Sequence, residues 1–180
     1  MSRTFAFLRA INVGGHTVTM ERLRELFQEA GLGTVETFIA SGNVIFNGGM
    51  ASEADLRKRI EGHLREALGY EVTAFLRRER ELGDLVIGCP FSEAEVTSAR
   101  ALNVALLQAP LAAEAEDHLQ SLRTDVDAFL VQGREVWWLC QAMQGESTFS
   151  NSVFERVVKA RATFRGFKTL QRLAAKYLDP

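Results

Sequence analysis

Residues 4–46 read TFAFLRAINVGGHTVTMERLRELFQEAGLGTVETFIASGNVIF, and their apolar residues follow two different periods. The segments 4–11, 34–40 and 44–46 are rich in apolar and β-branched residues and stop at turn-forming residues, which is typical of β-strands. From Thr19 to Ala30 the apolar residues instead recur at helical spacing, and a glycine follows. This stretch therefore predicts the order strand, helix, strand, strand.

A second helix and a further strand complete the first half of the chain. Ser52 is a good N-cap with acidic residues behind it, and the apolar spacing that follows predicts a helix as far as Gly69. Residues 70–76, YEVTAFL, predict the next strand. The resulting order, βαββαβ, is that of the ferredoxin-like sandwich.

The same order of elements returns in the second half. Strands are predicted at 101–109, 127–132 and 135–140, with a short one near 162–165, and helices after Pro110, near 154–158 and near 170–177. We therefore expect an α+β protein made of two ferredoxin-like (βαββαβ) halves packed as a pseudo-duplication. The predicted domains are 1–86 and 98–180, joined by a linker at 87–97, and the second ends in a basic helix.

Composition indicates an ordinary globular chain of 180 residues, with 47% hydrophobic and 24% charged residues. The N-terminus has no signal-peptide pattern, and no apolar run is long enough for a membrane span. Cys89 and Cys140 match no metal-binding spacing, so we expect free thiols, no metal, no cofactor and a cytoplasmic location. The oligomeric state stays open.

Charge is distributed unevenly along the chain. Residues 1–154 carry 14 basic and 21 acidic side chains, whereas residues 155–180 carry seven basic and two acidic ones. The C-terminal segment is thus a basic patch on an acidic body. It is either a solvated helix face or a surface for a partner.

Polar loop residues of the first half are predicted to meet at one edge of the sheet. A right-handed crossover makes the first two strands parallel, so the end of the first strand and the turn after the second lie on the same side. Arg165, in the basic segment, is expected to approach this edge. The predicted ligand-binding residues are Arg9, Asn12, Gly14, Gly15, Ser41, Gly42, Asn43 and Arg165.

Glycines, short amides and a helix N-terminus are the ingredients of an anion or phosphate site. Turns use the same residues for backbone reasons alone, and neither a Walker pattern nor GxGxxG is present. The second half has Gln108 and Gly133-Arg134 at the equivalent edge, with neither a double glycine nor Ser-Gly-Asn. This asymmetry favours a small anionic or phosphorylated ligand at the first edge.

Several stretches resemble a known family. RAINVGG (9–15), MERLREL (20–26), SGNVIF (41–46) and ATFRGFKTLQRL (162–173) are similar to signature segments of a largely bacterial family, domain of unknown function 1697. The last segment has Gly166 and Phe167 where the family usually has Asn and Trp. The resemblance implies ferredoxin-like halves and brings no activity or catalytic residue with it.

Two other functions stay open, and no residue is assigned a catalytic role. A nucleic-acid-binding module would stack bases on Phe5, Phe7 or Phe46, although we expect Phe5 and Phe7 to pack under the helices instead. A scaffold without activity would use the basic helix, or one indole of Trp137-Trp138 exposed at an interface. Whether the protein is an enzyme is not decided by these patterns.

Overall fold

The computed structural model describes residues 3–12, 14–142 and 147–178. The chain is an α+β protein that divides into two compact units, Met1–Gly83 and Asp84–Pro180. Each unit contains one four-stranded antiparallel sheet, and the two halves are similar in the order of their elements. The predicted division, with a linker at 87–97, stays a prediction.

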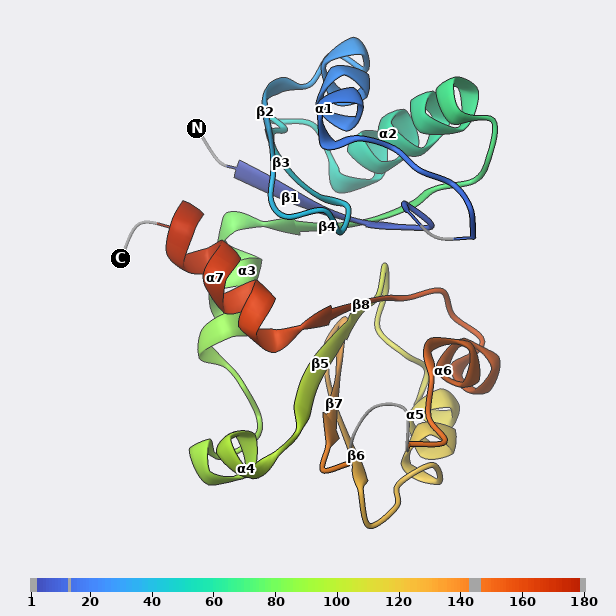
Figure 1. The fold of residues 1–180 in the computed structure, drawn as a ribbon, viewed down its shortest axis with the longest axis vertical. Coiled ribbons are helices and arrows are strands. Elements are labelled where there is room, and N and C mark those ends of the chain that lie inside the picture. Colours follow the sequence, from blue (N-terminus) through green and yellow to red (C-terminus); the bar gives the residue numbers. More distant parts are fainter. Residues whose placement is uncertain (1–2, 13, 143–146, 179–180) are drawn as a thin grey trace. The chain divides into compact units, whose positions relative to one another are not determined.

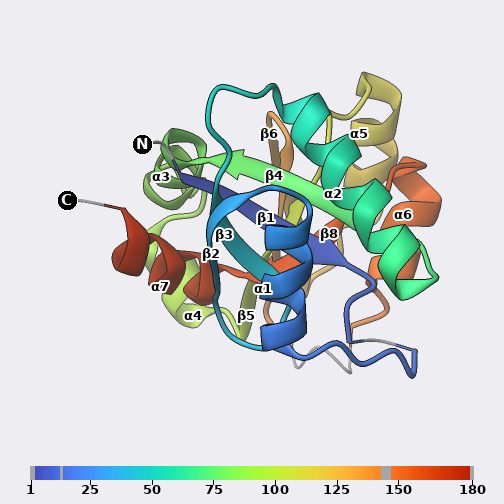
Figure 2. The same ribbon diagram turned by 90° about the horizontal axis from the view of Figure 1, so that it is seen from above.

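The first unit is a sheet with two helices on one face (Figure 1). Its strands lie in the order β2-β3-β1-β4, so β1 is hydrogen-bonded on both sides. Figure 2 shows α1 and α2 side by side over this sheet. The elements are β1 (Arg3–Arg9), α1 (Met20–Glu29), β2 (Gly33–Thr37), β3 (Asn43–Asn47), α2 (Glu53–Leu68) and β4 (Thr73–Arg78).

The second unit repeats this plan and adds a C-terminal helix. Its strand order is β6-β7-β5-β8, with β5 in the central position that β1 has in the first sheet. α3 (Glu79–Ile87) contains the boundary between the units and was not predicted from the sequence. The remaining elements are α4 (Glu93–Ser98), β5 (Ala101–Leu106), α5 (Ala113–Gln120), β6 (Asp127–Gln132), β7 (Glu135–Cys140), α6 (Asn151–Val158), β8 (Thr163–Gly166) and α7 (Phe167–Tyr177).

Local capping explains where several helices begin. The side chain of Thr19 accepts a hydrogen bond from Arg22 N, and that of Ser52 accepts one from Asp55 N. Ser92 and Glu95 form a full capping box at α4. Each side chain satisfies a backbone N–H that has no partner inside the helix, which contributes about 1 kcal/mol per cap.

The core of the first unit lies between the sheet and its helices. Ala6 and Leu8 of β1 pack there with residues of α1 and α2. Phe5 and Phe7 alternate with them and face the other side of the sheet, so the expectation that they lie under the helices was wrong. Phe46 does belong to this core, with its ring centroid 5.7 Å from that of Phe27.

The core of the second unit is aromatic and contains a buried carboxylate. Asp127 is 2% exposed and accepts a hydrogen bond of 2.7 Å from the indole nitrogen of Trp138. Ser147 donates to the other carboxylate oxygen over 2.8 Å. Trp137 and Trp138 are both buried, so the expected exposed indole was wrong, and Trp137 packs on Phe167 of α7 instead.

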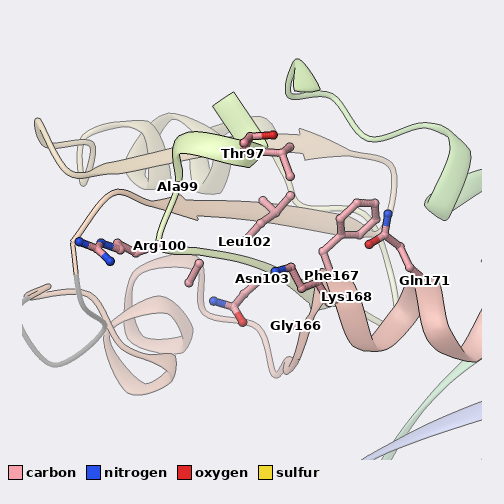
Figure 3. Close-up of a pocket in the computed structure, with 11 residues that line it drawn as sticks. Thr97, Ala99, Arg100, Leu102, Asn103, Gly166, Phe167, Lys168 and Gln171 are labelled. Carbon is pink, nitrogen blue, oxygen red and sulfur yellow. The ribbon is translucent and has the colours of Figure 1, made fainter. Parts of the chain in front are cut away.

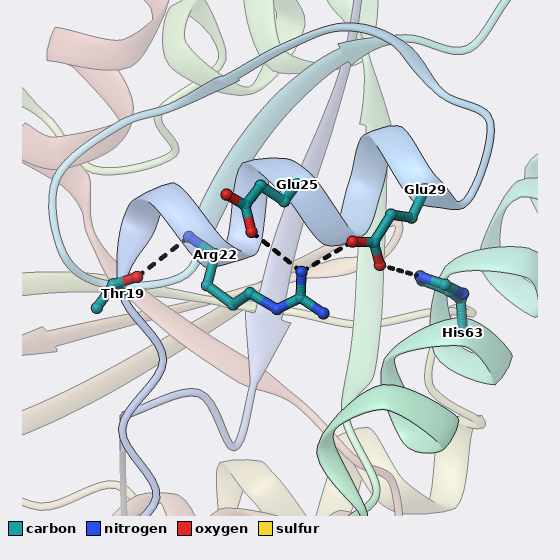
Figure 4. A network of polar contacts seen from close by, with 5 residues as sticks. All are labelled: Thr19, Arg22, Glu25, Glu29 and His63. Carbon is teal, nitrogen blue, oxygen red and sulfur yellow. Dashed lines mark hydrogen bonds and ion pairs between the residues drawn. The ribbon is translucent and has the colours of Figure 1, made fainter.

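A network of polar side chains joins α1 to α2 on the surface (Figure 4). Arg22 Nη1 lies 2.8 Å from Glu29 and 3.0 Å from Glu25, and Glu29 also contacts His63 of α2 at 3.3 Å. The hydrogen bond from Arg22 lowers the pKa of Glu29 below its usual value. Exposed pairs of this kind contribute little to stability because water and salt screen them.

Gly62 in the middle of α2 gives a direct test of the helix. Nothing lies within 4 Å of the position that a Cβ would take there. We expect Gly62→Ala to raise the free energy of unfolding by about 0.5–1 kcal/mol, because alanine loses less backbone entropy in a helix. Urea denaturation followed by circular dichroism measures this change.

Gly48 provides the contrast. An added Cβ there would lie 2.8 Å from Leu56 Cδ1 and 2.9 Å from Thr4 Oγ1. Gly48→Ala should therefore destabilise the protein by about 1–3 kcal/mol through overpacking. Equal effects of the two substitutions would contradict this account of the packing around α2.

Candidate functional site

The structure brings the loops after β1 and β2 together at one edge of the first sheet. Leu8 N donates to Gly42 O over 2.8 Å, which ties the hairpin tip to the end of β1. A Cβ on Gly42 would lie 3.3 Å from Leu8 Cβ and 3.4 Å from Ile11 Cβ. We call residues 9–12, 14–17 and 38–43 the glycine edge. Within it, Gly42 is buried and packs closely against Leu8 and Ile11.

Asn12 organises the first loop of the glycine edge. Its Oδ1 accepts a hydrogen bond of 2.7 Å from Val18 N, just before the N-cap of α1. The residue itself is exposed and has a φ of 57°, a conformation that asparagine tolerates better than most residues. Asn12 therefore closes the loop onto the start of α1 and still presents part of its side chain to solvent.

Asn43 holds the second loop of the glycine edge by hydrogen bonds from its buried side chain. It is 1% exposed, and its Nδ2 donates to Phe38 O over 3.1 Å and to Ser41 Oγ over 2.7 Å. Phe38 N returns a bond to Asn43 O over 3.0 Å. The amide is thus a support of the hairpin tip, whereas Ser41 is exposed at its surface.

Backbone in the left-handed region is concentrated at the glycine edge. For a β-branched residue such as Ile39, at φ 50°, this conformation is a genuine outlier and costs free energy. β2 ends at Thr37, before this residue, and so is shorter than predicted. The residues with positive φ at this edge are Ala10, Asn12, Gly14, Gly15, Ile39 and Gly42.

The second unit has the same backbone closure with a single left-handed residue in the corresponding described loops. Leu107 N donates to Arg134 O over 2.9 Å, at the place that Leu8 and Gly42 have in the first unit. In the corresponding described loops, residues 107–112 and 132–135, Gly133 alone has a positive φ. The fold accounts for the meeting of the loops, but it does not require the strained backbone of the glycine edge.

Two aromatic side chains near this edge were not singled out from the sequence. His16 stacks on Tyr70 with ring centroids 3.9 Å apart and an interplanar angle of 25°. The hydroxyl of Tyr70 is buried without a hydrogen-bond partner among the described residues, and this burial raises the pKa of its side chain. The sequence could have pointed to them only by position, because His16 directly follows Gly15 and Tyr70 lies just before β4.

The two predicted cationic residues, Arg9 and Arg165, differ in burial and in the unit to which they belong. Arg9 is half-buried at the end of β1. Arg165 belongs to β8 of the second unit and is 8% exposed, and its Nη1 donates to Thr163 Oγ1 over 2.7 Å and to Phe164 O over 2.9 Å. Burial lowers the pKa of Arg165 to about 10. Its approach to the glycine edge stays a prediction.

Cys89 and Cys140 are free thiols. Within the described ranges, no group of His, Cys, Asp and Glu side chains is arranged to hold a metal ion. The same ranges contain no helix with the length and apolar composition of a membrane span.

The fold is that of a two-unit α+β protein whose first unit has polar loops with left-handed backbone at one edge of its sheet. The profile of the family "Protein of unknown function (DUF1697)" matches residues 1–137, and the chain belongs to this family. The resembling segment at 162–173 lies beyond the matched residues.

A search of curated proteins gave no match. Among solved structures, the conserved bacterial protein SP0830 from Streptococcus pneumoniae is similar, with a TM-score of 0.79 and 19% identity over 99% of both chains. This likeness shows a shared fold.

The role of Asn43 as a support predicts a stability effect. Asn43→Ala removes two hydrogen bonds and leaves Phe38 O buried with one donor fewer. We expect the free energy of unfolding to fall by about 1–3 kcal/mol in urea denaturation. Asn47→Ala, at the other end of β3, loses one exposed bond to Gly49 N and should cost less than about 1 kcal/mol. An unchanged stability of Asn43→Ala would remove Asn43 from the hairpin support.

Proposed function

We propose that the protein binds a small anionic or phosphorylated ligand at the glycine edge. The observation that carries the proposal is the concentration of left-handed backbone there, whereas the corresponding described loops of the second unit contain one such residue, Gly133. Strain of this kind costs about 1–3 kcal/mol for each non-glycine residue and is typically kept where it serves a site. Left-handed turns also point backbone N–H groups into concavities that bind anions.

The exposed part of the loop has the right groups for such a ligand. Gly14, Gly15, His16 and Thr17 are exposed, and nothing lies within 4 Å of a Cβ on either glycine. A ligand therefore has close access to the backbone here. Asn12 and Ser41 add an amide and a hydroxyl, and Arg9 or Arg165 would supply the positive charge.

The two alternative functions, nucleic-acid binding and a scaffold role, receive less support. Phe5, Phe7 and Phe46 are each 1% exposed, so none of them offers a face on which a base could stack. The buried indoles of Trp137 and Trp138 remove the expected apolar contact of a scaffold. An enzymatic activity at the glycine edge is not part of the proposal.

We further propose that each half is a ferredoxin-like unit and that the two arose by duplication. The strand orders β2-β3-β1-β4 and β6-β7-β5-β8, with β1 and β5 in equivalent places, support this. A superposition of residues 1–80 on 98–165 would align β1 with β5 if the proposal holds. The cytoplasmic location likewise stays a prediction.

Gly14→Asp tests the anion site with a change of charge. Aspartate tolerates the left-handed conformation of Gly14, and no atom lies in the way of its Cβ. We expect inorganic phosphate to shift the amide signals of Gly15 and Ser41 in the unaltered protein. Gly14→Asp should weaken this binding by about tenfold or more through like-charge repulsion.

Two matched variants control this test. Gly14→Asn also places a side chain at a left-handed position but adds no charge, so this variant should bind phosphate nearly as well as the unaltered protein. Gly49→Asp adds the same charge in another open turn, where Gly49 has a φ of 57°, and should leave binding unchanged. Equal loss in Gly14→Asp and Gly49→Asp, or no shift at residues 15 and 41, would rule out an anion site at the glycine edge.

A further inference from the structure

A cavity of about 510 Å³ lies wholly within the second unit, between α4, β5 and the start of α7 (Figure 3). Thr97 and Ala99 line one side of it, and Phe167 and Gln171 of α7 line the other. A volume of this size suits a small organic molecule. Nothing in the glycine edge contributes to it.

The cavity exists because β8 is shorter than β5. β8 ends at Gly166, opposite Asn103, and the chain then turns into α7. Ala101 and Leu102 of β5 therefore have no β8 residue opposite them, and both line the cavity. The sheet edge and the first turn of α7 form adjacent walls.

The charge of the cavity is positive. Arg100 and Lys168 line it, both are exposed, and no acidic residue is among the lining residues. Neither cation has an ion-pair partner within the described part of the chain. A second cavity of the same unit, of about 420 Å³, contrasts with it, since Glu95, Asp125 and Asp127 line that one beside Arg123.

The N-terminus of α7 adds to the positive electrostatic potential of the cavity. Its N-cap is Gly166, which has no side chain to cap the helix, and its first turn contains no acidic residue. The first backbone N–H groups of this 11-residue helix are left for another acceptor. The helices α1, α2 and α6, by contrast, begin with Ser or Thr side chains that accept such bonds.

A buried amide points independently to a missing acceptor. Asn103 lines the cavity, and its Nδ2 is buried without a hydrogen-bond partner among the described residues. An unsatisfied buried donor costs about 1–3 kcal/mol. Asn103 is therefore a lining residue of the cavity whose donor lacks an acceptor among the described residues.

We propose that this cavity binds a small organic phosphate. The phosphate lies at the N-terminus of α7, between the side chains of Arg100 and Lys168, and accepts a bond from Asn103. The apolar part of the molecule contacts Leu102 and the rim of Phe167. The site is independent of the one proposed at the glycine edge.

Titration with AMP, ribose 5-phosphate and adenosine, followed by amide NMR and calorimetry, tests this assignment. Both phosphates should shift the amide signals of Phe167, Lys168 and Thr169, with AMP binding more tightly, and adenosine should not. The double variant Arg100→Gln, Lys168→Gln should weaken AMP binding by about tenfold or more, since it removes two charge-assisted contacts. Arg123→Gln, in the other cavity, should leave AMP binding unchanged.

The two proposed sites are read out separately in the same titration. Shifts at residues 14, 15 and 41 report the glycine edge, and those at 167–169 report the cavity, so either proposal survives the failure of the other. Adenosine binding as tight as AMP, an unaffected double variant, or unshifted amides at 167–169 would each overturn the phosphate site. Because Arg100 and Lys168 are exposed, a melting temperature close to that of the unaltered protein checks that the double variant is folded.

Discussion

The central strands β1 and β5 each pair with neighbours on both sides, and the loop closure at one edge of each sheet continues this pairing. β1 is antiparallel to β3 and β4, and β5 is antiparallel to β7 and β8. Because all backbone groups of a buried central strand need partners, the hairpin tip after β2 or β6 must close against the end of this strand. The bonds Leu8 N to Gly42 O and Leu107 N to Arg134 O are this closure in the two units.

Comparing the two closures separates what the fold needs from what it does not. The hydrogen-bond geometry is nearly the same in both units, yet Gly42 in one unit is replaced by Arg134 in the other. Arg134 also donates from its side chain to Gln108 O, so the second unit secures its loops with a cation and with one left-handed residue, Gly133. The first unit instead holds Ala10, Asn12 and Ile39 in left-handed conformations, at a cost in stability that its topology does not demand.

Positive charge near the C-terminus has several roles rather than one. Arg165 is buried on β8, and its Nη1 donates to Thr163 Oγ1 and Phe164 O of the same strand. Lys168 is exposed at the uncapped start of α7 and lines a cavity. A single basic segment in the sequence therefore contains a buried arginine and an exposed lysine, on either side of Gly166.

Local sequence patterns were sufficient to predict most helices and strands, because caps, turn glycines and apolar periods act within a few residues of the chain. Thr19 and Ser52 begin helices where expected, and the four strands of each sheet were predicted near their observed places. The meeting of the Asn12 and Asn43 loops also followed from crossover handedness.

Long-range packing decided the rest. Alternation along β1 shows that Phe5 and Phe7 share a face, but which face the helices cover depends on how α1 and α2 dock, and they dock over Ala6 and Leu8. The indole of Trp138 found its partner in Asp127, 11 positions away, and no local pattern predicts such a pair. The cavity beside α7 likewise depends on β8 ending opposite Asn103, because the register between two distant strands is set by tertiary pairing.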